Sequence, residues 1–301
     1  MTDRAAGALV GLACGDAVGT TVEFRPRGSL APLTDMVGGG PFGLLPGQWT
    51  DDTSMALCLA ESLLARNGFD AVDQMSRYLD WWRNGYQSST GVCFDIGLTV
   101  RAALAKFAAT GQPFCGSTDP FSAGNGALMR LAPVVLFFHP DADQIQTYAV
   151  ESSRTTHAAP EALDGSRLLA HVIALGLDGA SKADMLDASS LDFASPAVAA
   201  LAAGAYRAKT EAEIRGSGYS VASLEAALWC FHHTESFEAA ILRAANLGDD
   251  ADTTAAIVGQ IAGAFYGLAA IPEPWRARLH RGAEIEELGR RLGRAGPALA
   301  L

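Results

Sequence analysis

Apolar residues recur at helical spacing along most of the chain, and few runs alternate strictly between apolar and polar positions. Loops rich in Gly, Pro and Ser separate these runs, and none has the composition of an interdomain linker. We therefore expect an all-α protein in which residues 1–301 form a single domain, a compact orthogonal helical bundle. The pattern predicts helices over Ala5–Val18, Ser54–Ala65, Ala71–Arg83, Ile96–Ala109, Gly126–Phe138, Ile145–Ser153, Ala162–Leu175, Pro196–Ala208, Ser223–Phe231, Phe237–Ala245, Thr253–Ala269 and a last segment from Pro274.

Three glycines recur every four residues near the end of the chain, at Gly259, Gly263 and Gly267. A glycine inside a helix costs about 1 kcal/mol relative to alanine. Close backbone packing on this face is the expected compensation. The stretch 253–271 carries no charge, but its many small residues and Gln260 favour a core helix over a membrane span.

Two acidic clusters, 50–53 (Thr-Asp-Asp-Thr) and 249–254 (Asp-Asp-Ala-Asp-Thr-Thr), each stand directly before an apolar stretch that is typical of a buried helix. One carboxylate is enough to cap a helix, yet the clusters contain two and three. Unpaired carboxylates are too costly to keep ionised in a protein interior, and no run of Lys or Arg lies nearby.

Oxygen ligands from Asp and Thr select hard cations such as Mg²⁺, Mn²⁺ or Ca²⁺. The second cluster is not an EF-hand loop, because it lacks the glycine and glutamate of that motif. We therefore predict a binuclear metal centre in a central cleft. The two clusters would meet there across the core, although Asp52 and Asp252 are 200 positions apart.

The composition narrows the class of protein further. A hydrophobic content of 49% with 18% charged residues is typical of a well-buried globular protein. The net charge of −11 disfavours broad nucleic-acid binding and contact with anionic membranes. We expect a cytoplasmic protein, because the five cysteines are scattered without a CxxC pair and no secretory signal pattern opens the chain.

Five segments, in order along the chain, resemble the ADP-ribosylglycohydrolases. They are Gly15–Gly19 with Glu23, Trp49–Thr53, Gly124–Arg130, Ser153–His157 and Gly248–Thr253. A sixth segment, Cys93–Gly97, resembles the branch of dinitrogenase-reductase-activating glycohydrolases. The match runs from about residue 5 to about residue 270 and would form the core of the domain. One such motif is modest evidence, whereas five in order are strong.

The resemblance implies an enzyme that hydrolyses the bond between the anomeric carbon of ADP-ribose and an acceptor, most often a protein arginine. The substrate would be an ADP-ribosylated protein or small molecule, and ADP-ribose would be the product. Two Mg²⁺ or Mn²⁺ ions would hold the terminal ribose hydroxyls and a water. By family likeness their ligands are Thr50, Asp51, Asp52, Asp250, Asp252 and Thr253.

Four acidic residues are candidates for the chemistry: Asp51, Asp52, Asp95 and Glu23. From the sequence alone, Glu23 would be a solvated glutamate beside Arg25; the resemblance favours a ligand contact. Asp95 would either cap the following helix or hold the scissile ribose or the leaving group. Burial would raise the pKa of Asp95 and make it a competent proton donor.

The resemblance also indicates substrate-binding residues. The Gly124-Asn125-Gly126 turn enters a predicted helix, and its amides would face the diphosphate, since a helix N-terminus favours an anion. By position, Ser122 and Met129 would line the same pocket, and His157 would contact a phosphate or ribose. Tyr219 would either stack on adenine or be an ordinary loop tyrosine.

Three other functions stay open at this stage. The chain could be an inactive ADP-ribose-binding module, although a site freed from catalysis would have no reason to keep every Asp and Thr. It could hydrolyse another ADP-ribosyl linkage, to serine, a nucleic-acid base or a small guanidine. A two-metal phosphoesterase would be expected to place His among the ligands and a basic clamp nearby, and neither is found near the clusters.

Overall fold

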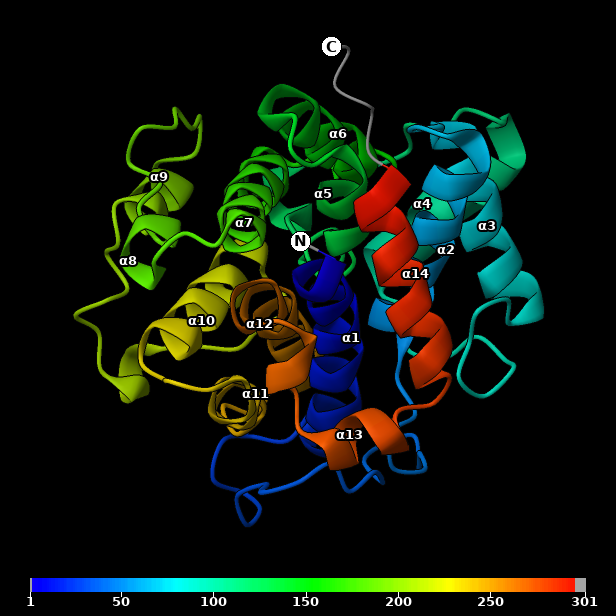
Figure 1. Ribbon diagram of the computed structural model, residues 1–301. Helices are drawn as coiled ribbons and strands as arrows, with labels where there is room; N and C mark the ends of the chain where they lie inside the picture. Colours follow the sequence, from blue (N-terminus) through cyan, green and yellow to red (C-terminus); the bar gives the residue numbers. More distant parts are fainter. Residues whose placement is uncertain (1, 296–301) are drawn as a thin grey trace.

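The computed structural model describes residues 2–295, and all regular structure in that range is helical (Figure 1). The predicted all-α class is therefore confirmed. The α-helices are α1 (Thr2–Gly19), α2 (Asp51–Arg66), α3 (Ala71–Asn84), α4 (Leu98–Thr110), α5 (Ala132–Phe138), α6 (Ala142–Arg154), α7 (Pro160–Asp178), α8 (Lys182–Met185), α9 (Pro196–Ala202), α10 (Ser220–His232), α11 (Phe237–Ala245), α12 (Ala251–Tyr266), α13 (Glu273–Arg278) and α14 (Gly282–Ala295).

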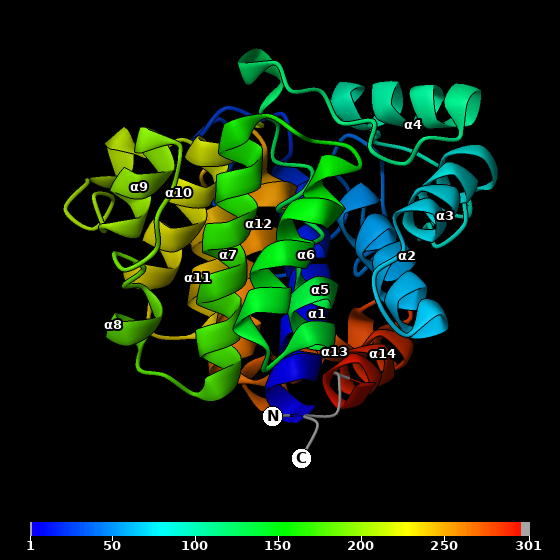
Figure 2. The ribbon, with the colours of Figure 1, turned by 90° about the horizontal axis from the view of Figure 1, so that it is seen from above.

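Helices α1 and α12 lie side by side at the centre of the molecule (Figures 1 and 2). Their backbones touch: a Cβ atom on Gly11 would lie 2.3 Å from the Gly259 carbonyl oxygen, and one on Gly263 would lie 2.0 Å from that of Gly7. The close packing predicted for Gly259 and Gly263 is thus confirmed. Gly267 instead ends α12 with a φ of 81°, a conformation that favours glycine.

The remaining helices form a shell around this central pair. Helices α7, α10 and α11 pack against α12, while α14 packs along α1 (Figure 1). Helix α3 packs on α2 and on α4, which lies at the edge of the molecule (Figure 2). The C-terminal helix α14 buries Ile285 and Leu292.

Some predicted helices are shorter than the apolar pattern suggested. The helix expected over 126–138 begins only at Ala132, because residues 126–130 form consecutive turns and Pro133 occupies the first helical turn. The helix expected over 196–208 ends at Ala202, shortly before Gly204, whose φ is 82°. Helix α4 begins at Leu98, not Ile96.

The residues Thr2–Val22 are long and apolar enough, by length and composition, to cross a membrane. In the folded chain, however, 94% of the apolar window is buried inside the protein. Burial against α12 and α14 explains its apolar character, so α1 is a core helix of this bundle.

Candidate metal and active site

A cavity of about 550 Å³ lies where the N-terminus of α2, the N-terminus of α12 and the loop before α4 meet. Much of its wall is acidic or hydroxyl-bearing, with contributions from Glu23, Asp51, Asp95, Asp250, Asp252 and Thr253. Two further carboxylates, Asp16 and Asp52, are fully buried beside it.

The two acidic clusters meet, as predicted from their chemistry. Carboxylate oxygens of Asp16, Asp52 and Asp252 lie within 4.8 Å of one another, and so do those of Glu23, Asp95 and Asp252. The α1–α12 contact brings Asp16 beside Asp252: a Cβ on Gly19 would lie 2.4 Å from the Asp252 Cα. Asp252 belongs to both groups and joins them into one site.

Helix capping does not account for these residues. Thr50 and Asp250 stand at the N-cap positions of α2 and α12, but neither side chain makes a capping hydrogen bond. The N-cap of α4 is Gly97, so the capping role considered for Asp95 is wrong. Asp249 is exposed and lies outside the site, so the second cluster contributes two carboxylates and not three.

The charge of the site is uncompensated by protein cations. No Lys, Arg or His forms an ion pair with these carboxylates anywhere in residues 2–295. Burial, followed by the neighbouring carboxylates, raises the pKa of Glu23 to about 9 and that of Asp95 to about 7. The same causes raise the pKa of Asp52 and of Asp252 well above its ordinary value.

Two buried carboxylate oxygens in this group, Oδ1 of Asp52 and Oε2 of Glu23, have no hydrogen-bond partner. Buried polar atoms of native proteins are almost always paired, and a buried charge needs a partner. Carboxylate and hydroxyl oxygens that converge with no protein cation among them are suitable ligands for a hard divalent ion such as Mg²⁺ or Mn²⁺.

Glu23 is held at the site by the backbone around it. The Phe24 amide donates to the Asp249 carbonyl at 2.7 Å, and the Asp249 amide donates to the Arg25 carbonyl at 2.8 Å. This reciprocal pair ties the loop after α1 to the start of α12. Glu23 is only 2% exposed, so it is not the solvated glutamate that its neighbours in the sequence suggest.

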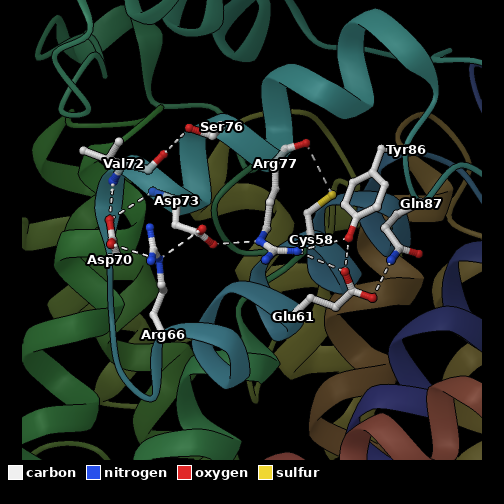
Figure 3. Close-up of polar contacts among 10 residues, drawn as sticks. All are labelled: Cys58, Glu61, Arg66, Asp70, Val72, Asp73, Ser76, Arg77, Tyr86 and Gln87. Carbon is white, nitrogen blue, oxygen red and sulfur yellow. Dashed lines mark hydrogen bonds and ion pairs between the residues drawn. The ribbon is translucent and has the colours of Figure 1, made fainter.

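The loop carrying Asp95 is anchored to α2 and to the segment before it. Glu61 of α2 accepts hydrogen bonds from Gln87 Nε2 at 2.7 Å, from an Arg77 guanidinium nitrogen at 3.1 Å and from the Tyr86 hydroxyl (Figure 3). Closer to the site, Ser89 Oγ donates to the Trp49 carbonyl at 2.5 Å, next to Thr50. These bonds fix the spacing between the loop before α4 and the acidic N-terminus of α2.

Asn125 joins the opposite wall of the cavity to the acidic site. Its Nδ2 donates to Asp250 Oδ2 at 2.7 Å, while its amide donates to the Gly218 carbonyl at 3.0 Å. The Gly124 amide donates to the Ser122 carbonyl at 2.7 Å. The prediction that the backbone amides of this turn face the diphosphate is therefore wrong for Gly124 and Asn125, whose amides are already hydrogen-bonded. The helix predicted to begin at Gly126 does not begin there.

His157 is buried and lines the cavity beside the 124–126 turn. The Thr156 hydroxyl accepts from Arg130 at 2.7 Å, and its oxygen lies 2.9 Å from His157 Nδ1. Burial and then the Arg130 charge lower the pKa of His157 to about 3. The neutral imidazole directs Nε2 toward Gly124 and Gly126, where a Cβ would lie 3.2 Å from that nitrogen.

The other residues predicted for the pocket divide between two locations. Met129 lines the cavity. Ser122 does not: its Oγ donates to the Asp119 carbonyl at 2.6 Å, and it lines a neighbouring cavity. Tyr219 is 41% exposed and donates to Glu161 at 2.6 Å, so only its neighbour Gly218 reaches the cavity wall.

A model of the ADP-ribosylglycohydrolase family matches residues 1–299 of the chain. The chain belongs to this family. An ADP-ribosylarginine hydrolase Tri1 of Serratia proteamaculans is 45% identical over 96% of this chain and 79% of its own length. The ADP-ribosyl-[dinitrogen reductase] glycohydrolase of Rhodospirillum rubrum is 32% identical, over 94% of this chain and 92% of its own length.

A solved structure described as an ADP-ribosylglycohydrolase-related protein complex has a TM-score of 0.88 and 44% identity, and covers 98% of this chain and 99% of its own. The resemblance drawn from five short motifs is therefore confirmed over almost the whole chain. In this ADP-ribosylglycohydrolase, the motif residues Gly15 and Gly19 allow the backbone of α1 to pack closely against that of α12.

Asp16 is the site residue to which sequence reasoning assigned no role. It lies in the Gly15–Gly19 motif, and the only sign of its role was a single carboxylate in an apolar helix of small residues. In the structure it is fully buried and accepts hydrogen bonds from Thr50 and Thr53, at the N-terminus of α2.

Proposed function

We propose that this ADP-ribosylglycohydrolase hydrolyses the N-glycosidic bond between ADP-ribose and arginine, with two Mg²⁺ or Mn²⁺ ions as cofactors. The observation that carries the proposal is the meeting of unpaired, buried carboxylates in one cavity of a chain that is 45% identical to an ADP-ribosylarginine hydrolase. The products are ADP-ribose and the free arginine side chain.

The metal ligands in this proposal are Thr50, Asp51, Asp52, Asp250, Asp252 and Thr253. Four of them line the cavity, and the other two lie at its base, where Thr50 Oγ1 is 3.1 Å from Asp52 and 3.3 Å from Asp252. When bound, hard divalent ions would orient the ribose hydroxyls and activate a water for attack on the anomeric carbon. Asn125 keeps Asp250 in place through its 2.7 Å hydrogen bond.

The acidic residues that line the cavity favour arginine as the acceptor to which ADP-ribose is attached. Guanidinium is a permanent cation, and Glu23, Asp51 and Asp95 on the cavity wall each offer it a hydrogen-bond-accepting oxygen. In the reaction, water adds to the anomeric carbon, the bond from that carbon to the guanidine nitrogen breaks, and that nitrogen takes a proton.

Asp95 is the proposed proton donor, because it lines the cavity and its pKa is raised to about 7. Glu23, Asp51 and Asp52 are the carboxylates available to take a proton from the attacking water. The neutral His157 lines the cavity, and in the tautomer with its proton on Nε2 it donates a hydrogen bond to a phosphate or ribose oxygen of the ADP-ribose.

The protein is proposed to act in the cytoplasm, on ADP-ribosylated proteins or small guanidine compounds. All five of its cysteines are free thiols, which suits a reducing compartment.

A panel of linkages tests the function. Purified protein with Mg²⁺ or Mn²⁺ is incubated with peptides carrying ADP-ribose on arginine or on serine and with an ADP-ribosylated base, and released ADP-ribose is measured. We expect release from arginine, abolished by EDTA. Release only from serine or the base would reassign the acceptor, and binding of ADP-ribose without release from any substrate would establish a binding module instead.

A further inference from the structure

Asp16 occupies an unusual position for a carboxylate. It lies in the last turns of the central helix α1, is fully buried, and forms no ion pair within residues 2–295. Instead it accepts four hydrogen bonds from one turn. Oδ1 accepts from the amide and the hydroxyl of Thr50, both at 2.9 Å, and Oδ2 accepts from the amide and the hydroxyl of Thr53, at 3.0 and 2.7 Å.

These four bonds decide what Asp16 can do. A carboxylate offers about four lone-pair positions, and here each oxygen receives two donors. Asp16 therefore has no position left for a metal ion, even though its oxygens lie within 4.8 Å of those of Asp52 and Asp252. Its side chain is fully used in holding the turn that begins α2.

The hydroxyl of Thr50 has one proton and three carboxylates around it. Its Oγ1 lies 2.9 Å from Asp16, 3.1 Å from Asp52 and 3.3 Å from Asp252. Asp16 is the nearest of the three, and its Oδ1 is already aligned by the Thr50 amide. When the proton points to Asp16, the lone pairs of Thr50 Oγ1 face Asp52 and Asp252.

When Asp52 and Asp252 are ionised, three oxygens face one another with no proton between them, which is a stable arrangement only around a cation. We propose that Asp16 is a positioning residue that makes Thr50 a metal ligand, by accepting its hydroxyl proton and fixing the 50–53 turn. This inference rests on the metal centre of the proposed function. Asparagine cannot replace Asp16, because its NH₂ group would face donors where the carboxylate accepts.

Calorimetric titration with Mn²⁺ tests the proposal on four proteins: wild type, Asp16→Asn, Thr50→Val and the double variant. Loss of a residue that orients a metal ligand typically weakens metal binding by about 10- to 100-fold. We expect this from each single variant. The double variant should bind no more than about threefold more weakly than the weaker single variant, because residues acting through one another are not additive.

Thr53→Val is the matched control. The substitution removes the hydrogen bond that the Thr53 hydroxyl donates to Asp16, but it leaves Thr50 and its hydrogen-bond partners in place. We expect its Mn²⁺ affinity to stay within about threefold of wild type, well short of the loss expected for Asp16→Asn. Circular dichroism and thermal melting establish that each variant is folded.

The possible results distinguish a failure of the proposed role of Asp16 from a failure of the proposed metal centre. A wild type that binds no Mn²⁺ overturns the metal centre itself. Normal Mn²⁺ binding by Asp16→Asn, or additive losses in the double variant, overturns the role of Asp16 alone, since a pure charge effect would be additive. If Asp16→Asn does not fold, a wild-type crystal soaked in Mn²⁺ decides: Thr50 Oγ1 should contact the metal, and direct coordination by Asp16 would refute the proposal.

Discussion

Asp249 and Asp252 show how sharply the surroundings of a single residue decide its role. They stand three positions apart at the start of α12, yet Asp252 is 1% exposed and lies among buried carboxylates, whereas Asp249 is exposed. Only the position of each side chain relative to the α1–α12 contact separates them. A pair of matched variants can therefore test the metal centre.

The first prediction compares Asp252→Asn with Asp249→Asn by isothermal titration with Mg²⁺ and Mn²⁺. Asp252→Asn should lose binding or show reduced stoichiometry, because Asp252 belongs to both groups of converging carboxylates. Asp249→Asn should bind like wild type, since asparagine also tolerates the left-handed φ of 57° at that position. Equal binding by the two variants would remove Asp252 from the centre.

The second prediction concerns Asp95→Asn. Loss of the proposed proton donor should lower kcat by about 100-fold or more, while Mn²⁺ affinity stays within about threefold of wild type because Asp95 is not among the proposed ligands. Activity assays and titration on the same preparation measure both. A fall in Mn²⁺ affinity that matches the fall in kcat would make Asp95 a metal ligand instead.

At this scale the sequence predicted residue types better than side-chain directions. The acidic clusters identified the metal chemistry because several carboxylates at the start of a buried helix need a cation to remain ionised. The directions of Ser122 and Tyr219 depended on partners that the local sequence does not reveal. Tyr219 turns toward Glu161, 58 positions away, and Ser122 toward the Asp119 carbonyl.

At the scale of elements, the helix pair α1–α12 positions both halves of the site. The third prediction is that Gly11→Ala lowers the free energy of unfolding by about 1–3 kcal/mol, because the new Cβ would lie 2.3 Å from the Gly259 carbonyl oxygen. Separating the helices should also weaken Mn²⁺ binding, since α1 carries Asp16 and α12 carries Asp252.

Gly165→Ala in the interior of α7 is the control for this substitution. Its Cβ would meet only ordinary contacts, the nearest at 3.6 Å from Leu128, so the better helix propensity of alanine should leave the protein as stable or more stable. Chemical denaturation measures both variants. Equal stability of Gly11→Ala and wild type would show that the two backbones do not need to touch.

Helical periodicity located nearly every long helix but not all of the ends. The predicted and observed bounds of α11 agree, because the polar residues Ser236 and Asn246 stand at its two ends. Residues 126–131 were expected to be helical from their apolar run. They instead form turns held by tertiary contacts, including the bond from Arg130 to the Thr156 hydroxyl and the contact of Gly126 with His157. Tertiary bonds of this kind override local periodicity.

At the scale of the whole molecule, buried charge couples stability to pH. In metal-free protein the fourth prediction is a fall in unfolding free energy as the pH rises from about 6.5 to 9. Glu23 and Asp95, with pKa values raised to about 9 and about 7, bind more protons in the folded than in the unfolded chain over this range. Stability then decreases with rising pH.

The opposite slope is expected in acid. Above about pH 4.5 the extra protons on folded Glu23 and Asp95 outweigh the one that His157, with its pKa lowered to about 3, fails to bind; below about pH 4 the unfolded carboxylates are protonated as well, so the effect of His157 dominates and stability falls as the pH falls. Divalent cation should reduce the alkaline decline, because its positive charge at Asp252 favours the ionised form of the neighbouring Glu23. Thermal melting across pH, with EDTA and with Mg²⁺, tests this. A metal-free protein whose melting temperature rises toward pH 9 would contradict the proposed burial of Glu23 and Asp95.

The central claim is that the buried carboxylates form a metal centre that carries out hydrolysis of ADP-ribosylarginine. The most direct test is to titrate metal-free protein with Mn²⁺ while measuring, in the same samples, bound metal and the rate of ADP-ribose release from an ADP-ribosylarginine peptide. We predict a negligible rate without metal and a rate that rises and saturates with occupancy. A rate independent of bound Mn²⁺, or full occupancy without any release, would contradict this claim.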